Sequence, residues 1–221
     1  MIKSVLFDAY GTLYDVHSVT KKCNELYHGR GMEISQIWRQ KQLDYVWITS
    51  LMDKYKDFWS LTKEALYYSL EELGLQYNEK IVEEILNEYL HLSLYPEVME
   101  ALNNFRPREL FILSNGNLRM LNELVKNTYL DKHLDGIISV EDYKVYKPKP
   151  DAYDLAAKRL GLDKEEILFI SSNGWDAAGS KSFGFTVGWL NRFGKPADRL
   201  GMTPDFIASD LKELAQITKS I

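Results

Sequence analysis

Cysteine is nearly absent from the sequence, and its histidines are few and scattered. Cys23 is the single cysteine among 221 residues, so no disulfide can form within the chain and a reducing compartment is expected. The four histidines, His17, His28, His91 and His133, show no metal-ligand spacing. The sequence therefore predicts neither a disulfide-rich secreted domain nor a zinc protein, and it favours a cytoplasmic one.

Long apolar runs and an excess of positive charge are also missing. No segment reaches the roughly 18 consecutive apolar residues that a membrane helix needs, and the opening apolar run is too short for a signal peptide. The net charge of −5 disfavours a nucleic-acid or anionic-membrane partner. What the sequence does have is a hydrophobic content of 45%, which is enough for one sizeable core with a subdomain.

Short apolar runs alternate with helical patterns at the start of the chain and throughout its second half. This alternation predicts an α/β fold, with a parallel sheet covered by helices on both faces. We expect strands at 2–7, 109–113, 136–140, 167–171, 186–190 and 206–208. Helices are expected at 96–104, 118–129 and 151–160, before residue 183 and after Asp210.

Residues 16–95 differ in character from the chain on either side. Their apolar and aromatic side chains recur at spacings of three and four, with helices expected at 61–73 and 79–89, and no segment between residues 16 and 91 is typical of a strand. A crossover between parallel strands needs far fewer residues. We therefore interpret the segment as an all-helical cap subdomain, inserted into a Rossmann-like core domain made of residues 1–15 and 96–221.

Polar side chains stand where four of the predicted strands end. In chain order they are Asp8 and Thr12, then Ser114 and Asn115, then Lys147, then Ser171, Asn173 and Asp176. Taken singly, each has a structural explanation, such as a turn carboxylate for Asp8 or a helix N-terminal carboxylate for Asp176. In open α/β sheets, ligands bind beyond the carboxyl ends of the strands. The ordered set therefore favours a site in which Asp8, held by the following backbone amides and the Thr12 hydroxyl, acts as a nucleophile.

The motifs at these strand ends carry a resemblance to a known family. In chain order they read DAYGTL (8–13), LSNGN (113–117), YKPKPDAY (146–153) and SSNGWDAAG (171–179). The set resembles the haloacid dehalogenase (HAD) superfamily. The segments IWRQKQLDYVW (37–47) and DFWSLTKEAL (57–66) are similar to the cap of the L-2-haloacid dehalogenases. The resemblance implies a HAD-like fold and an enzyme that acts on carbon–halide bonds.

Two departures from the commoner HAD pattern bear on metal binding. Phosphatases of the superfamily carry Asp-x-Asp, where the second aspartate protonates an alcohol leaving group, whereas Tyr10 stands at that position here. Their fourth motif supplies carboxylates to Mg²⁺, whereas this chain has Ser171 and Asn173 there. Halide needs no proton to leave. The resemblance therefore implies a reaction that uses no metal and no other cofactor.

The reaction that the resemblance implies has two steps. Asp8 attacks the α-carbon of a short-chain L-2-haloalkanoic acid from behind and expels halide, which leaves an ester on the enzyme. Water then attacks the Asp8 carbonyl carbon and releases a D-2-hydroxy acid, so the carbon is inverted. Lys147 is expected to orient Asp8 and offset its charge, and Asp176 to orient or deprotonate the water. The partners expected are the 2-haloacid, water and the halide product.

The resemblance also assigns the remaining positions of the site. Arg39 and Asn115 would cradle the halide, and Ser114 would bind the substrate carboxylate together with backbone N–H groups after Asp8. Supporting hydrogen bonds are expected from Thr12, Tyr153, Ser171 and Asn173. An apolar wall around the α-substituent is expected from Tyr10, Leu43, Phe58 and Trp175, although aromatic residues at helical spacing often belong to a core.

Other functions are compatible with parts of this pattern. A magnesium-dependent HAD phosphatase for small phosphate esters would use Asp8, Ser114 and Lys147 equally well. The second alternative is a relative that uses the same Asp8 to open another carbon–heteroatom bond, such as that of a strained-ring amino acid or a fluoroacid. A non-catalytic binding protein on this fold is the third alternative. Relatives often form dimers through the cap and adjacent helices, and the apolar cap helices permit a homodimer here.

Overall fold

The computed structural model describes residues 1–221, and its centre is one six-stranded sheet. All five pairs of neighbouring strands are parallel, in the order β5-β4-β1-β6-β7-β8. The strands are β1 (Ser4–Phe7), β4 (Glu109–Ser114), β5 (Gly136–Ser139), β6 (Ile167–Ser171), β7 (Thr186–Leu190) and β8 (Phe206–Ala208). The predicted α/β class is confirmed, and β1 occupies the middle of the sheet.

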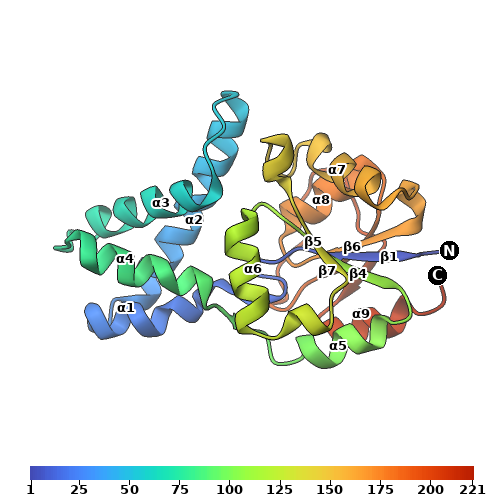
Figure 1. The fold of residues 1–221 in the computed structure, drawn as a ribbon, viewed down its shortest axis with the longest axis horizontal. Coiled ribbons are helices and arrows are strands. Elements are labelled where there is room, and N and C mark those ends of the chain that lie inside the picture. The colour runs from blue at the N-terminus through green and yellow to red at the C-terminus, as the bar shows by residue number, and fades with distance from the viewer.

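Helices cover both faces of this sheet (Figure 1). One face carries α5 (Val98–Phe105), α6 (Leu118–Asn127) and α9 (Leu211–Ile217), and the other carries α7 (Pro150–Leu160) and α8 (Gly174–Phe183). For α5 to α8 this division follows from right-handed crossovers, because the chain moves along the sheet in one direction from β1 through β4 to β5 and then in the other from β5 through β6 to β7. The helix predicted at 118–129 ends earlier than expected, because Tyr129 adopts a left-handed conformation with φ of 59°.

Four further helices form a separate layer beside the sheet, which we call the helical block (left in Figure 1). It contains α1 (Thr20–Leu26), α2 (Gly31–Leu51), α3 (Phe58–Glu72) and α4 (Glu79–Asn87). Asp57 and Asn78 cap α3 and α4 by accepting hydrogen bonds from the Ser60 and Ile81 backbone N–H groups, both at 3.0 Å. As predicted, no strand lies within 16–91, although α4 gives way to a 3₁₀ turn at Glu88–Leu90.

Two short linkers join the helical block to the sheet. They pair as antiparallel strands, β2 (Tyr14–Asp15) and β3 (Ser93–Leu94), and the Tyr95 backbone N–H donates to the Leu13 carbonyl at 3.1 Å. The sequence pattern did not predict this pairing, because two-residue strands leave no periodic signal. The linkers lie at the expected boundaries near residues 15 and 95, and the division into cap and core stays a prediction.

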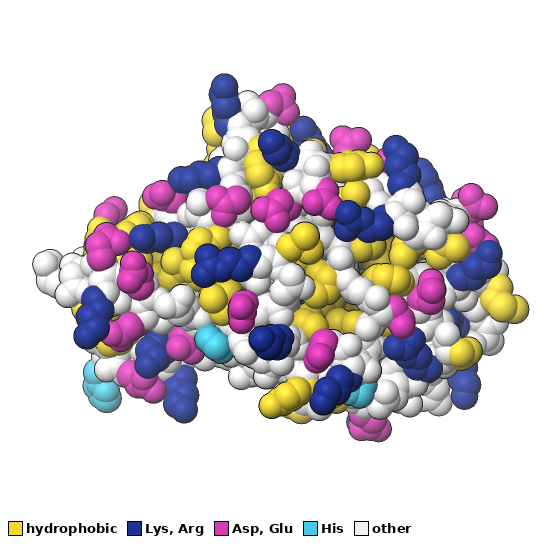
Figure 2. All heavy atoms as spheres, in the orientation of Figure 1, with side chains coloured by type: hydrophobic (Ala, Val, Ile, Leu, Met, Phe, Trp, Pro, Cys, Tyr) yellow, Lys and Arg dark blue, Asp and Glu magenta, His cyan; other side chains and the backbone are white.

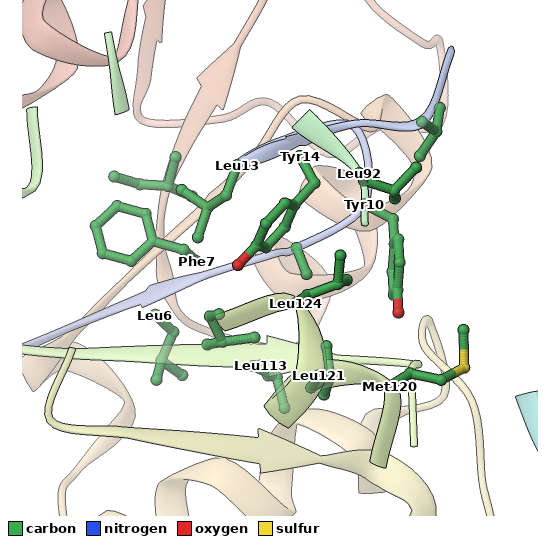
Figure 3. Close-up of a cluster of buried hydrophobic side chains, with 14 of the residues drawn as sticks. Leu6, Phe7, Tyr10, Leu13, Tyr14, Leu92, Leu113, Met120, Leu121 and Leu124 are labelled. Carbon is green, nitrogen blue, oxygen red and sulfur yellow. The ribbon is translucent and has the colours of Figure 1, made fainter. Parts of the chain in front are cut away.

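Buried side chains hold the central strand in place. Figure 3 draws Leu6 and Phe7 of β1, Leu113 of β4 and Leu121 and Leu124 of α6 within one buried cluster, and all five are fully buried. The cluster in the figure also includes Tyr10, Leu13, Tyr14, Leu92 and Met120. Because both faces of β1 are packed at the density of a protein interior, the residue at its carboxyl end has a fixed position.

The surface gives little indication of a large partner. No helix of the chain combines the length and apolar character that a membrane span requires. On the face drawn in Figure 2, basic and acidic side chains are interspersed rather than gathered by sign. The absence of a nucleic-acid partner stays a prediction.

Candidate active site

Asp8 lies directly after β1, at the middle of the carboxyl edge of the sheet. It is only 4% exposed. Its Oδ1 accepts a hydrogen bond from Lys147 Nζ at 2.8 Å, and its Oδ2 accepts from Thr12 Oγ1 at 3.0 Å and from Asn173 Nδ2 at 2.8 Å. A carboxylate with three such donors is held in one orientation. The turn that follows is made by Gly11, whose φ of 90° suits glycine.

One expectation about this turn is wrong. The backbone amides after Asp8 do not donate to its carboxylate: those of Thr12, Leu13 and Tyr14 donate to the Ala9 carbonyl at 3.0–3.3 Å, and those of Ala9 and Tyr10 have no acceptor in the chain. The turn closes on its own backbone instead. Side chains from other strand ends, far away in the sequence, hold the carboxylate.

Lys147 is fully buried and joins two carboxylates. Its Nζ donates to Asp8 Oδ1 at 2.8 Å, to Asp176 Oδ2 at 2.7 Å and to the Leu113 carbonyl at 3.1 Å. Its backbone N–H donates to Asn115 Oδ1 at 2.9 Å, which fixes the loop. Burial lowers the pKa of Lys147, but the charges of Asp176 and Asp8 outweigh it, so the pKa lies above its ordinary value. The side chain is therefore an ammonium at neutral pH.

Asp176 sits in the first turn of α8 and is fully buried. Its Oδ1 accepts a hydrogen bond from the Tyr153 hydroxyl at 2.8 Å. Burial raises the pKa of Asp176 to about 6, with Lys147 acting in the opposite direction and Asp8 adding to the rise. A carboxylate with a pKa near neutrality is suited to accept a proton from water. Burial also raises the pKa of Tyr153 well above its ordinary value, so its hydroxyl remains a donor.

The end of β6 supports the Asp8 side chain from the other direction. Ser171 Oγ accepts from the Asn173 backbone N–H at 3.1 Å, and Asn173 Nδ2 donates to the Tyr10 carbonyl at 3.0 Å as well as to Asp8. The Ser172 backbone N–H donates to Thr12 Oγ1 at 2.9 Å, so the Thr12 hydroxyl is left to donate to Asp8. Sequence reasoning missed Ser172, although it stands inside the fourth motif.

Ser114 and Asn115 lie at the end of β4 and are buried. Ser114 Oγ accepts from the Gly116 backbone N–H at 3.1 Å, and Asn115 Oδ1 is taken by the Lys147 backbone. The Asn115 side-chain amide group has no acceptor within the protein. Both residues are thus brought to the same edge of the sheet as Asp8, while their roles toward a halide or carboxylate stay predictions.

Arg39 reaches the site from the helical block. It belongs to α2, and its guanidinium donates to Gln42 Oε1 at 2.8 Å and to the Tyr10 carbonyl at 3.3 Å. Gln42 is itself fixed by a 2.6 Å bond from its amide nitrogen to Thr62 Oγ1. The prediction that Arg39 faces the site rather than solvent agrees with these contacts. Sequence reasoning missed Gln42, whose only signal was a polar side chain on an otherwise apolar helix face.

A cleft of about 370 Å³ opens between α2 and the strand ends. Its lining includes the predicted pocket residues Arg39, Leu43 and Trp175 as well as Asn173, but it does not include Asp8, Ser114 or Asn115. Tyr10 and Phe58 are not among its lining residues. They are 3% and 2% exposed and pack against each other, with ring centroids 5.4 Å apart. The two side chains thus pack against each other rather than line the cleft, and their contact with a substituent stays a prediction.

Comparison with known proteins supplies the family. Residues 2–184 match the family model of the haloacid dehalogenase-like hydrolases. The chain belongs to this family. The superfamily resemblance that the motifs indicate is confirmed.

Individual members of the family are similar to this hydrolase over nearly its whole length. It is 42% identical over 218 residues to the (S)-2-haloacid dehalogenase of Pseudomonas sp. (strain YL). The aligned region covers 98% of this chain and 94% of that enzyme. It is 44% identical over 207 residues to haloacetate dehalogenase H-2 of Moraxella sp. (strain B), with 93% and 92% covered. The structure of the L-2-haloacid dehalogenase of Xanthobacter autotrophicus with chloropropionic acid covalently bound matches with a TM-score of 0.96, at 39% identity over 100% of both chains.

The donor set of this haloacid dehalogenase-like hydrolase does not fit the Mg²⁺ of phosphatase relatives. No group of three or more histidine, cysteine, aspartate or glutamate side chains is placed to hold a metal. The two carboxylates that remain, Asp8 and Asp176, both contact the Lys147 ammonium. Mg²⁺ prefers a site rich in carboxylate and water oxygens, whereas a buried ammonium already neutralises these two.

Proposed function

We propose that this hydrolase removes halide from short-chain (S)-2-haloalkanoic acids and yields 2-hydroxy acids of inverted configuration. The observation that carries the proposal is the Asp8 carboxylate, buried and held by Lys147, Thr12 and Asn173. No second carboxylate stands two positions further on, where Tyr10 lies. The site thus offers an oriented nucleophile without the acid that an alcohol leaving group needs.

The first step is a displacement at the α-carbon. An Asp8 carboxylate oxygen forms a bond to that carbon while the carbon–halogen bond breaks on the opposite side, and the halide leaves with the bonding pair. Holding both reactants in this line supplies much of the rate enhancement. Arg39, a permanent cation at the cleft, is placed to stabilise the departing halide.

The second step is hydrolysis of the Asp8 ester. Asp176 takes one proton from water, and the oxygen attacks the Asp8 carboxyl carbon. The ester bond to the substrate oxygen then breaks, and that oxygen receives the second proton of the water. Asp176 releases its proton to solvent, which restores both carboxylates. Lys147, 2.8 Å from Asp8 and 2.7 Å from Asp176, stabilises the negative charge that builds on the Asp8 oxygen.

Recognition of the substrate carboxylate requires donors that the protein itself does not use. The backbone N–H groups of Ala9 and Tyr10 have no acceptor within the chain, and the Ser114 hydroxyl lies at the neighbouring strand end. Backbone N–H groups at a strand end bind anions well. A monoanion bound there leaves its α-carbon next to Asp8, whereas a phosphate dianion would meet the Asp8 charge without a metal to screen it.

Halide release in the presence of EDTA tests the proposal. We expect release from (S)-2-chloropropanoate and none from the (R)-enantiomer, because only one enantiomer presents its carbon–halogen bond opposite to Asp8. Asp8→Asn should lower the rate by roughly a thousandfold or more, whereas Asp142→Asn, at an exposed ion pair, should not change it.

A phosphatase would give the opposite pattern. It would hydrolyse 4-nitrophenyl phosphate only with added Mg²⁺ and would leave both chloropropanoates intact. Equal rates for the two enantiomers, or full activity of the Asp8→Asn variant, would contradict the proposed role of Asp8.

A further inference from the structure

A buried ion pair lies next to the proposed site but outside its machinery. Arg192 follows β7, and its guanidinium pairs with Glu97 just before α5. The two side chains are only 8% and 12% exposed. Withdrawing two charges from water is costly, and the attraction between them often does no more than offset that cost. Stability alone therefore gives a weak reason for this pair.

The remaining contacts of Arg192 lead to the nucleophile loop. Its Nη2 donates to the Thr12 carbonyl at 2.7 Å, and no other group of the protein donates to that oxygen. The hydroxyl of the same Thr12 donates to Asp8 Oδ2. A shift of the Thr12 backbone would move this hydroxyl and change the orientation of the Asp8 carboxylate. Arg192 thus acts on Asp8 through one intervening residue.

Glu97 and Tyr95 anchor Arg192 on its other side. The guanidinium lies over the Tyr95 ring, 4.1 Å from its centroid, a favourable cation–π arrangement. Tyr95 and Glu97 belong to the segment that returns from the helical block, and the Tyr95 backbone N–H donates to the Leu13 carbonyl. Arg192 therefore connects the segment that contains Tyr95 and Glu97 to the turn at Asp8–Tyr14.

We propose that Arg192, with Glu97 as its counterion, is a positioning residue for the reaction: it holds Thr12 so that the Thr12 hydroxyl aligns Asp8 for attack. The inference rests on the proposed function. Arg192 also borders the cleft, but Glu97 neutralises its charge and Thr12 occupies its second terminal nitrogen. It acts on the nucleophile rather than by binding the substrate anion.

The kinetics of three variants distinguish a positioning role of Arg192 from direct binding of the substrate anion. Because a misplacement of about 1 Å can cost about a hundredfold in rate, we expect Arg192→Ala to lower kcat by roughly tenfold to a hundredfold with KM nearly unchanged. Arg192→Lys should recover part of kcat, and Glu97→Gln should lower it less. Arg159→Ala, which removes an exposed partner of Asp142, is the matched control and should leave kcat unchanged. A raised KM with unchanged kcat would overturn the proposal in favour of direct substrate binding.

A double substitution tests whether Arg192 acts through Thr12. Thr12→Val removes the hydroxyl that contacts Asp8. In that background, Arg192→Ala should lower kcat much less than it does in the parent protein, because the contact that it positions is already gone. If Arg192→Ala lowers kcat by the same factor in the parent protein and in Thr12→Val, Arg192 acts by another route and the proposal is overturned.

Hydrogen exchange keeps the inference testable apart from the proposed function. In Arg192→Ala, the hydrogen-bonded amides of residues 11–14 should exchange faster than in the parent protein, whereas Arg159→Ala should leave them unchanged. Unchanged exchange would overturn the positioning role even in an active enzyme. If the parent protein releases halide from no 2-haloacid, the proposed function fails, and the exchange result still decides whether Arg192 holds the turn.

Discussion

At the scale of single residues, the central feature is one ammonium shared by two carboxylates. Lys147 Nζ lies 2.8 Å from Asp8 and 2.7 Å from Asp176, and all three side chains are buried. The shared ammonium offsets the charges of the two buried carboxylates, and a buried charge without a partner would be costly. Burial raises the pKa of Asp176 in spite of this cation, and Asp8 accepts further hydrogen bonds from Thr12 and Asn173.

The raised pKa of Asp176 predicts a pH dependence for turnover. Asp176 accepts a proton from water only when it is ionised, and its pKa of about 6 places the change within the assay range. We expect kcat to be constant above about pH 7 and to fall about tenfold per unit below about pH 6, because the protonated fraction grows by that factor. Steady-state halide release measured across this range checks the prediction.

A substitution identifies the group responsible for this dependence. In Asp176→Asn the Asp8 ester should form and then persist, so intact-protein mass spectrometry should detect the adduct after mixing with substrate. A flat pH profile in the parent protein, or rapid loss of the adduct in the variant, would contradict the role of Asp176.

The sequence identifies the residues of the proposed site better than it predicts the contacts between them. Asp8, Lys147 and Asp176 are recognisable because each ends a predicted strand or begins the next helix. The contacts between them cannot be recognised in the same way, because 139 positions of sequence separate Lys147 from Asp8. Gln42 and Arg192 were missed for another reason: Gln42 lies within a helix, and Arg192 follows the strand at 186–190 but belongs to none of the four motifs.

At the scale of elements, the approach of α8 to the Lys147 loop brings the two carboxylates to one ammonium. Gly179 of α8 faces this loop so closely that a Cβ there would lie 2.5 Å from Pro148 Cβ and 2.6 Å from the Tyr153 hydroxyl. The absence of a side chain lets the helix pack at this distance. A proline ring cannot move aside as a flexible side chain can.

Gly179→Ala is therefore expected to move α8 away from the loop. We predict a loss of about 1–3 kcal/mol in the free energy of unfolding, typical of overpacking, and a lower kcat, because Asp176 moves with the helix. Urea denaturation and halide release measure the two effects. Ser182→Ala, on an exposed position of the same helix, is the control, and equal stability of both variants would contradict the close approach.

Periodic elements were predictable, and short ones were not. The runs at 186–190 and 206–208 coincide with β7 and β8 because short apolar runs between turns are typical of buried strands. The β2–β3 pairing and the 3₁₀ turns were missed because two to four residues carry no period. The end of α6 differs because the left-handed backbone of Tyr129 has no glycine to mark it.

At the scale of the whole molecule, the proposed site requires both the sheet and the helical block. The sheet supplies Asp8, Lys147 and Asp176, whereas α2 supplies Arg39, whose guanidinium donates to the Tyr10 carbonyl. The two parts are joined by the short β2 and β3 linkers. The cleft is accordingly lined from both parts, by Arg39 and Leu43 of α2 and by residues that follow the strands, such as Asn173.

The most direct test of Asp8 as the nucleophile is a single turnover in H₂¹⁸O with enzyme in excess over (S)-2-chloropropanoate. Because the new carbon–oxygen bond is made by the Asp8 carboxylate, the lactate formed should carry ordinary oxygen, and the peptide that contains Asp8 should gain ¹⁸O. Direct attack of water on the substrate would instead place ¹⁸O in the lactate of the first turnover and leave the peptide unlabelled, which would contradict an Asp8 ester.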